Sequence, residues 1–296
     1  MSSGRRTRRK SHIGDVIRFL LMIIALGVFL YSGWTLYGFY KDYKQSADEY
    51  EHLESSYLAE EETGSENYDA LEDDDTLKDD AAVQSITGKE LVNRVENGRE
   101  ITVPVMKNPI DFEQLQSVNE DIVGWLRIRG LGISYPVVQG EDNDYYLHRT
   151  FERTDNFAGC IFMNCDNDSD LSDQNTIIYG HNMKDGSMFG KLKNYNEEDV
   201  YQKSKYFWIY TPDLIYQYRI FSASIVNKTG LTYQIMFTED EFNQFVNQAF
   251  SSSVVDNSGL SVTREDRVVT LSTCTGDDST RFVVVGKLAQ IYASKE

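Results

Sequence analysis

Hydrophobic and polar residues divide the chain into three stretches with different patterns. Residues 19–40 contain no charged side chain, and residues 41–90 are rich in acids with few branched apolar residues. From residue 91 onward, short runs rich in Val, Ile, Tyr and Phe alternate with polar turns, which is typical of β-strands. The sequence therefore predicts an apolar segment, an acidic stalk and one mainly β domain at residues 91–296.

Eight strands are expected within this domain. They cover residues 124–128, 133–139, 160–164, 176–181, 206–210, 215–226, 268–274 and 282–291. An exposed strand edge can pair with another chain, and a sheet that closes on itself has no such edge. Because little helix separates the strands, we expect a closed eight-stranded β-barrel.

Two helices are expected beside the barrel. The first, at residues 111–119, precedes the strands and would turn three apolar side chains inward: Phe112, Leu115 and Val118. The second lies in a late strand connection and begins at Thr238, which forms a capping-box pattern with Glu241. The following residues give one apolar face at helical spacing, formed by Phe242, Phe245, Val246 and Ala249. This face is expected to cover the barrel, and its contact with a substrate is left open.

The apolar segment is typical of a membrane anchor. Residues 19–40 reach the roughly 20 residues that are needed to span a bilayer. Residues 1–18 hold six Lys or Arg side chains against one acid, which predicts a cytoplasmic basic tail. A cleaved signal peptide is the alternative, but its apolar region is normally about 7–15 residues long. The aromatic residues near Tyr40 also suit a membrane interface, so an uncleaved single-pass anchor is favoured.

Residues 41–90 are expected to form a disordered extracellular stalk. Acidic runs occur at residues 60–62 and 73–75, and such a segment buries too little apolar area to order itself. It would be either a self-repelling spacer or a simple solvated tether. The net charge of −18 argues against a nucleic-acid partner, which needs a basic surface.

The candidate chemistry lies near the C-terminus. Cys274 ends one predicted strand, and Arg281 stands at the head of the next, seven residues later. A thiolate is a strong nucleophile, and a nearby fixed positive charge favours it. His181 follows a predicted strand and precedes a loop, so it is the best-placed proton carrier for this thiol.

The remaining histidines are weaker candidates for this role. His12 lies in the basic tail and His52 in the acidic stretch, while His148 beside Arg149 is expected to be structural. The alternatives for the site residues are a buried apolar Cys274, a His181 hydrogen-bonded at a strand end, and an ion pair between Arg281 and Asp277 or Asp278.

Several motifs resemble those of class B sortases. Residues 270–274, TLSTC, match the TLxTC motif, and the strand that begins at Arg281 is similar to the arginine strand of that family. Residues 179–189, YGHNMKDGSMF, resemble the class B histidine motif. Residues 119–125 and 135–147 also fit class B, so the similarity runs from about residue 110 to residue 288 in the expected order.

The resemblance implies a membrane-anchored cysteine transpeptidase with His181, Cys274 and Arg281 as catalytic residues and Thr273 as a substrate-binding residue. Cys274 would cleave an NPxTx-like sorting signal of a secreted protein after Thr and form a thioester. A peptidoglycan or pilin amine would then accept the acyl group. The resemblance implies neither a metal nor an organic cofactor.

Two rival functions are weighed against this interpretation. An L,D-transpeptidase also uses Cys, His and Arg, but its arginine usually lies two residues from the cysteine, whereas the spacing here is seven. The other rival is a catalytically silent surface module that binds peptides or scaffolds pili.

Cys160 and Cys165 could form a disulfide only if the chain bends between them, and a zinc site there is weakly indicated. Two unpaired cysteines are favoured, with Cys160 buried.

Overall fold

The computed structural model describes residues 12–59 and 90–295. The chain forms two compact units, residues 1–45 and residues 46–296. Residues 1–11 of the expected basic tail (residues 1–18) and residues 60–89 of the expected stalk (residues 41–90) lie outside the described residues.

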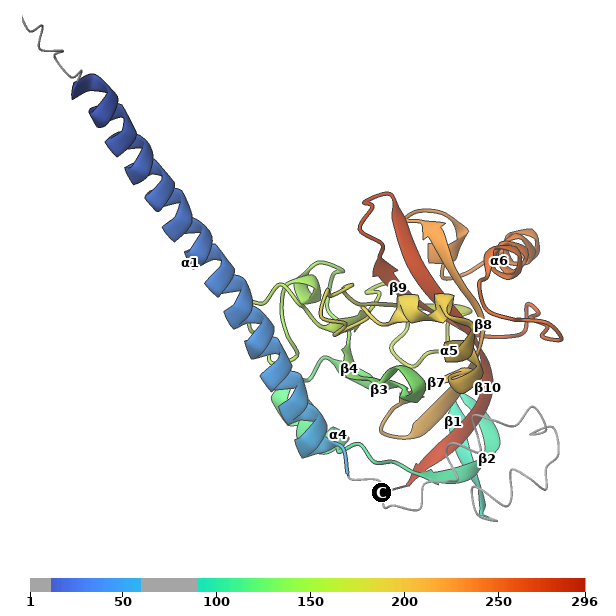
Figure 1. The fold of residues 1–296 in the computed structure, drawn as a ribbon. Helices are drawn as coiled ribbons and strands as arrows, with labels where there is room; N and C mark the ends of the chain where they lie inside the picture. The colour runs from blue at the N-terminus through green and yellow to red at the C-terminus, as the bar shows by residue number, and fades with distance from the viewer. Residues whose placement is uncertain (1–11, 60–89, 296) are drawn as a thin grey trace, which may run out of the picture. The chain divides into compact units, whose positions relative to one another are not determined.

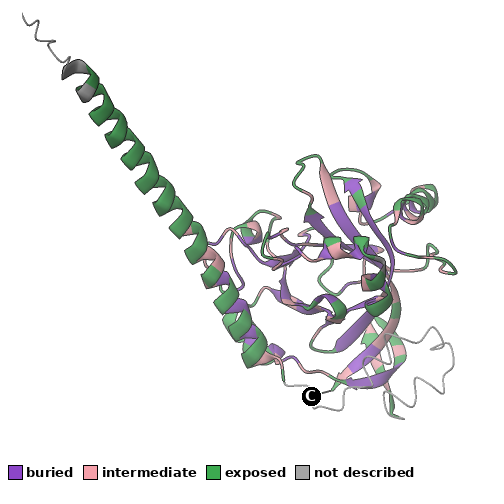
Figure 2. Ribbon diagram, viewed as in Figure 1, coloured by how far each residue is buried: buried purple, intermediate pink, exposed green. Residues whose placement is uncertain are grey.

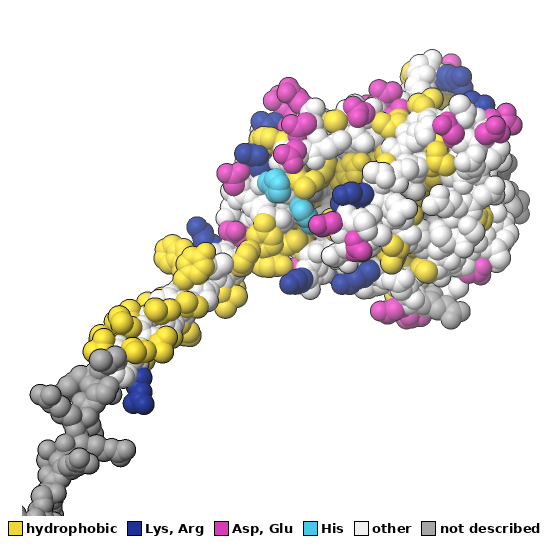
Figure 3. Space-filling view, turned by 90° about the horizontal axis from the view of Figure 1, so that it is seen from above, with side chains coloured by type: hydrophobic (Ala, Val, Ile, Leu, Met, Phe, Trp, Pro, Cys, Tyr) yellow, Lys and Arg dark blue, Asp and Glu magenta, His cyan; other side chains and the backbone are white. Residues whose placement is uncertain are grey.

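The first unit consists of most of helix α1 (His12–Tyr57), which has an exposed apolar surface (Figures 2 and 3). From Val16 onward, this helix is long and apolar enough to cross a membrane. One expectation is corrected here, because residues 41–57 are helical and do not form a disordered stalk. Composition did not show this, since the side chains that this stretch buries include polar ones, Ser46 and Glu49, beside Tyr50 and Leu53.

The second unit contains a closed barrel of eight strands (Figure 1). Its strands are β3 (Ile122–Ile128), β4 (Ile133–Val138), β5 (Ile161–Met163), β6 (Asn175–Tyr179), β7 (Tyr206–Tyr210), β8 (Leu214–Asn227), β9 (Val268–Cys274) and β10 (Thr280–Lys295). The order around the ring is β10-β8-β7-β3-β4-β5-β6-β9, and the pairing of β9 with β10 closes it. The mainly β fold and the eight-stranded closure are therefore confirmed.

Two further strands were not expected. Strands β1 (Leu91–Glu96) and β2 (Arg99–Lys107) form an antiparallel hairpin, and β2 pairs in parallel with the end of β10. Asn97 and Gly98, at the turn, both have positive φ values. Asn-Gly is a strong signal for such a two-residue hairpin turn. The signal was present in the sequence and was missed.

Short helices surround the strands. They are α4 (Phe112–Val118), α5 (Glu198–Lys203), α6 (Glu239–Ser252), η1 (Arg129–Leu131), η2 (Tyr145–Leu147), η3 (Leu192–Asn196) and η4 (Leu231–Tyr233). Helix α4 buries Phe112 and Leu115 as expected, but Val118 is 40% exposed, because its position at the end of the helix turns it outward.

Helix α6 confirms the capping box. The Thr238 hydroxyl accepts a hydrogen bond from the Glu241 backbone N–H, and the Glu241 carboxylate accepts one from the Thr238 backbone N–H. Its buried side chains, Phe242, Phe245 and Ala249, pack against Phe221 and Val283 of strands β8 and β10. The helix therefore covers the barrel wall as expected.

Candidate active site

Strands β9 and β10 place Cys274 beside Arg281. The two strands are antiparallel neighbours, and Cys274 is the register partner of Arg281. Directly opposed residues in an antiparallel pair present their side chains on the same face of the sheet, with Cβ atoms about 4.5–5.5 Å apart. The exposed thiol and the guanidinium are thus held together by main-chain pairing.

A tight polar turn joins these two strands. The hydroxyls of Thr275 and Thr280 are 2.6 Å apart, and the Asp277 carboxylate accepts hydrogen bonds from the backbone N–H and hydroxyl of Ser279. These bonds to Ser279 lower the pKa of Asp277. The pairing of the strands and this turn together fix the backbone positions from which the thiol and the guanidinium project.

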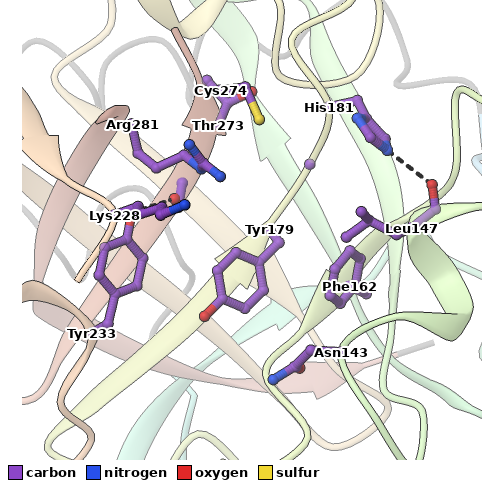
Figure 4. A pocket seen from close by; sticks show the side chains of 12 residues that line it. Asn143, Leu147, Phe162, Tyr179, His181, Lys228, Tyr233, Thr273, Cys274 and Arg281 are labelled. Carbon is purple, nitrogen blue, oxygen red and sulfur yellow. Dashed lines mark hydrogen bonds between the residues drawn. The ribbon is translucent and has the colours of Figure 1, made fainter. Parts of the chain in front are cut away.

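Arg281 uses one nitrogen within this turn. That nitrogen donates to the backbone oxygen of Thr280 at 2.7 Å and to that of Asp278 at 3.3 Å. Among the contacts of the described residues, Arg281 makes no ion pair with the carboxylate of Asp277 or Asp278, the alternative considered from the sequence. The guanidinium lies at the wall of the pocket that holds Cys274 (Figure 4).

Parallel pairing of β6 with β9 brings His181 to the same edge of the barrel. Tyr179, at the end of β6, is the register partner of Ser272. Because parallel strands end on the same side, the loop after β6 and the end of β9 emerge together. The Asn182 amide donates a hydrogen bond to the backbone oxygen of Cys274 at 2.7 Å, which joins the two segments.

The ring of His181 is oriented by a backbone carbonyl. Its Nε2 lies 2.8 Å from the oxygen of Leu147 and carries the hydrogen, since a carbonyl can only accept. Figure 4 shows the other ring nitrogen on the side facing Cys274. Burial lowers the pKa of His181; the bond to Leu147 opposes this shift and the nearby His148 adds to it. The resting ring is therefore neutral at neutral pH, with Nδ1 able to accept a proton.

All four residues predicted for the site line one pocket of about 320 Å³. The lining comprises Asn143, Leu147, Phe162, Tyr179, Gly180, His181, Lys228, Tyr233, Ser272, Thr273, Cys274 and Arg281. Figure 3 shows hydrophobic side chains flooring a hollow on this face of the barrel, with charged and histidine side chains at its margin. An extended peptide could thus rest on an apolar floor with its reacting carbonyl near the thiol.

Aromatic rings form part of that floor. The rings of Tyr179 and Tyr233 are stacked with centroids 6.4 Å apart. The ring centroid of Phe162 lies 5.3 Å from that of Tyr179. The Tyr233 hydroxyl is 2.8 Å from that of Ser272. Lys228 and Tyr233 lie in the connection between β8 and α6. No residue of α6 is among the described residues that line the pocket.

Thr273 differs from the exposed Cys274 beside it because its side chain is buried. It is 3% exposed, and its hydroxyl has no hydrogen-bond partner among the described residues. A buried hydroxyl without a partner is costly, and a bound molecule could supply one. β-Strand propensity explains a threonine here but does not account for the unused hydroxyl.

The other cysteines stand apart from this pocket. Cys160 is buried as expected, Cys165 is half-buried, and both are free thiols. Burial raises the pKa of Cys160 to about 12, so this thiol is not reactive. No cluster of three or more potential metal ligands occurs in the part of the chain that the structure describes.

Comparisons with known proteins agree with this geometry. The family model described as Sortase domain matches residues 126–289. Sortase B of Listeria monocytogenes is 32% identical over 272 residues, which are 90% of this chain and 95% of that protein.

Solved structures give the same result. A Staphylococcus aureus sortase B–substrate complex is 36% identical with a TM-score of 0.56, covering 60% of this chain and 84% of that chain. A sortase B complexed with triglycine is 36% identical with a TM-score of 0.57, covering 60% and 85%.

The closed barrel and the matching family model define the class of protein: the chain belongs to the sortase family. Within that family its relatives are sortase B proteins, so it is a class B sortase, a cysteine transpeptidase.

Proposed function

We propose that this enzyme cleaves a C-terminal sorting signal and transfers the upstream protein to an amine, with Cys274, His181 and Arg281 as its catalytic residues. One observation carries the proposal: the thiol, the imidazole and the guanidinium come from separate segments and line a single pocket. An acyl-transfer site needs such a nucleophile, proton carrier and oxyanion stabiliser within reach of one carbonyl.

The first half of the reaction is acylation of Cys274. The thiol gives its proton to Nδ1 of His181, and the thiolate attacks the carbonyl carbon of the substrate threonine. Arg281 donates hydrogen bonds to the oxyanion of the tetrahedral intermediate, a contribution often worth about 3 kcal/mol per donor. His181 then protonates the leaving amine, the peptide bond breaks, and a thioester remains on Cys274.

The second half releases the product. An incoming amine attacks the thioester carbonyl while His181 removes its proton. The carbon–sulfur bond breaks, and Cys274 leaves as a thiolate that regains the proton from His181. Thr273 is assigned to substrate binding, because its buried hydroxyl lacks a partner in the free pocket.

The proposed substrate is a secreted protein with an NPxTx-like signal, and the proposed acceptor is a peptidoglycan or pilin amine. The substrate complex and the triglycine complex of related sortases support a peptide donor and an amine acceptor. Helix α1 is proposed as a single-pass anchor with its N-terminus in the cytoplasm and the barrel outside, supported by its apolar exposed length and the basic residues 1–18.

Mass spectrometry of the full chain in detergent, mixed with an NPxTx peptide and triglycine, tests the proposal. We expect a peptide cleaved after threonine, a product joined to triglycine, and an acyl adduct on Cys274. Peptide that binds without cleavage would favour the silent surface module, and cleavage by Cys274→Ala would exclude Cys274 as the nucleophile.

A further inference from the structure

We propose that Glu49 and Tyr50, near the end of helix α1, are positioning residues for His181. This inference rests on the catalytic role proposed for His181 above. The inference gives the last turns of helix α1 a function in catalysis, in addition to the membrane attachment proposed for the helix as a whole.

These residues belong to the catalytic domain and not to the exposed helix. Glu49 and Tyr50 are 9% and 8% exposed and Leu53 is 1% exposed, whereas residues 16–31 of the same helix are exposed throughout. Residues at this spacing share one helix face. A carboxylate is buried at a cost unless it is hydrogen-bonded. Glu49 meets this need by accepting a bond from the backbone N–H of Glu152 at 3.0 Å, and Glu152 lies in the loop that joins Leu147 to Gly159.

The first connection to His181 runs through main-chain atoms. The Tyr50 hydroxyl donates to the oxygen of Gly159 at 2.8 Å. Gly159 has a φ of +61°, and a Cβ built there would lie 2.7 Å from the backbone oxygens of Tyr146 and Leu147. The next residue, Cys160, donates its N–H to the oxygen of Tyr146 at 2.9 Å.

This packing places the Leu147 carbonyl. The peptide segment that Tyr50 holds lies directly against Leu147, and the Leu147 oxygen accepts the hydrogen bond from Nε2 of His181. That bond sets the tautomer and the orientation of the ring. A shift of the segment around Gly159 would therefore move the proton acceptor of the reaction.

The second connection reaches His181 from the other side of its loop. The ring of Tyr50 meets that of Tyr135 edge to face at 5.3 Å. The Tyr135 hydroxyl accepts a bond from the N–H of Met188 at 3.1 Å, and Phe189 donates its N–H to the oxygen of His181 at 3.0 Å. Tyr50 is thus linked, through Gly159 and through Tyr135, to both segments that hold the histidine.

The test compares full-length variants in detergent with an NPxTx peptide and triglycine. Tyr50→Phe removes only the hydroxyl, and Glu49→Ala removes the acceptor for Glu152. We expect each to lower kcat about tenfold and the double variant about a hundredfold, because small misplacements of a catalytic group are costly. KM should stay within about twofold, since neither residue lines the pocket.

Two controls separate positioning from loss of stability. Tyr40→Phe makes the same chemical change on an exposed part of the helix and should leave kcat unchanged. Thr238→Ala removes a helix cap that takes part in none of these contacts and should lower the melting temperature without a fall in kcat. A positioning role requires that Tyr50→Phe lowers kcat more than Thr238→Ala does, even when Thr238→Ala loses as much stability as Tyr50→Phe or more.

The inference would be overturned by a Tyr50→Phe and a Glu49→Ala protein that both turn over peptide at the wild-type rate. It would also be overturned if their kcat fell only as far as that of Thr238→Ala. A wild-type protein that cleaves no peptide would instead overturn the proposed function, so the two failures are distinguishable.

Discussion

The two sides of the active site are built in different ways. Cys274 and Arg281 are register partners on adjacent strands and are joined by a turn of six residues. His181 lies on an irregular loop after β6, and its ring is held by the backbone carbonyl of another loop. The side that holds Cys274, the proposed nucleophile, is therefore set by local strand pairing, whereas the position of His181, the proposed proton carrier, depends on contacts between distant segments.

This difference determines how each side can fail. A substitution in the β9–β10 hairpin removes the chemistry of the replaced side chain and leaves the backbone in place, because the main-chain hydrogen bonds between the strands remain. A substitution around His181 acts through packing, since Leu147, Gly159 and Phe189 place the ring without providing chemistry. The first kind should remove a chemical step, and the second should weaken it by displacement.

Cys274→Ala gives the largest expected effect on the strand side. Loss of the proposed nucleophile should reduce transpeptidation about a thousandfold or more and leave the fold intact, since the exposed side chain contributes little to packing. Cleavage and melting temperature are the measurements. Cys165→Ala, outside the pocket, is the matched control and should retain activity. Residual turnover near the wild-type rate would exclude Cys274 as the nucleophile.

Arg281→Lys keeps the charge on the strand side but loses the planar fork. We expect kcat to fall by about 10²–10³, because a lysine cannot reproduce the directions of the guanidinium donors. Arg264→Lys changes an exposed arginine away from the pocket and serves as the control. Full activity of Arg281→Lys in steady-state kinetics would mean that the positive charge alone, or the surface contacts of the side chain, account for an arginine at position 281.

Gly180→Ala tests the packed side. A Cβ at this position would lie 2.8 Å from the Phe189 ring and would also meet the Ile161 side chain. Such overpacking should cost about 1–3 kcal/mol of unfolding free energy and displace the adjacent His181, so that kcat falls as well. Denaturant unfolding checks the stability loss. Gly38→Ala, where nothing lies within 4 Å, should leave the barrel unchanged.

The same contrast explains what could be predicted from the sequence. Strands β7 and β9 have the expected bounds. The thiol, the histidine and the arginine could be proposed from motifs in the sequence, and the structure brings them to one pocket. The role of Leu147 could not be predicted, since a backbone carbonyl leaves no trace in residue type. The burial of one face of residues 46–53 was also hidden, because a face that includes Ser46 and Glu49 has no apolar period.

The smallest expected effect is the pH dependence of stability that His181 contributes. Burial, the main cause, lowers the pKa of His181 in the folded protein below its ordinary value of 6.5. Below pH 6.5 the unfolded chain takes up the proton first, so unfolding is favoured and stability falls as pH decreases toward the folded-state pKa. Above pH 6.5 both states are neutral at this residue and the contribution is constant.

The difference in unfolding free energy between wild type and His181→Gln isolates this contribution, because His52 and His148 remain in both proteins. We expect the wild-type advantage to shrink as the pH falls below 6.5. Denaturant unfolding at a series of pH values measures it. A difference that stayed constant would show that the Leu147 carbonyl offsets burial, and one that grew toward acidic pH would show that the carbonyl outweighs burial. In either case the resting imidazole would hold its proton more tightly than proposed, and a larger fraction of the rings would be unable to accept the thiol proton.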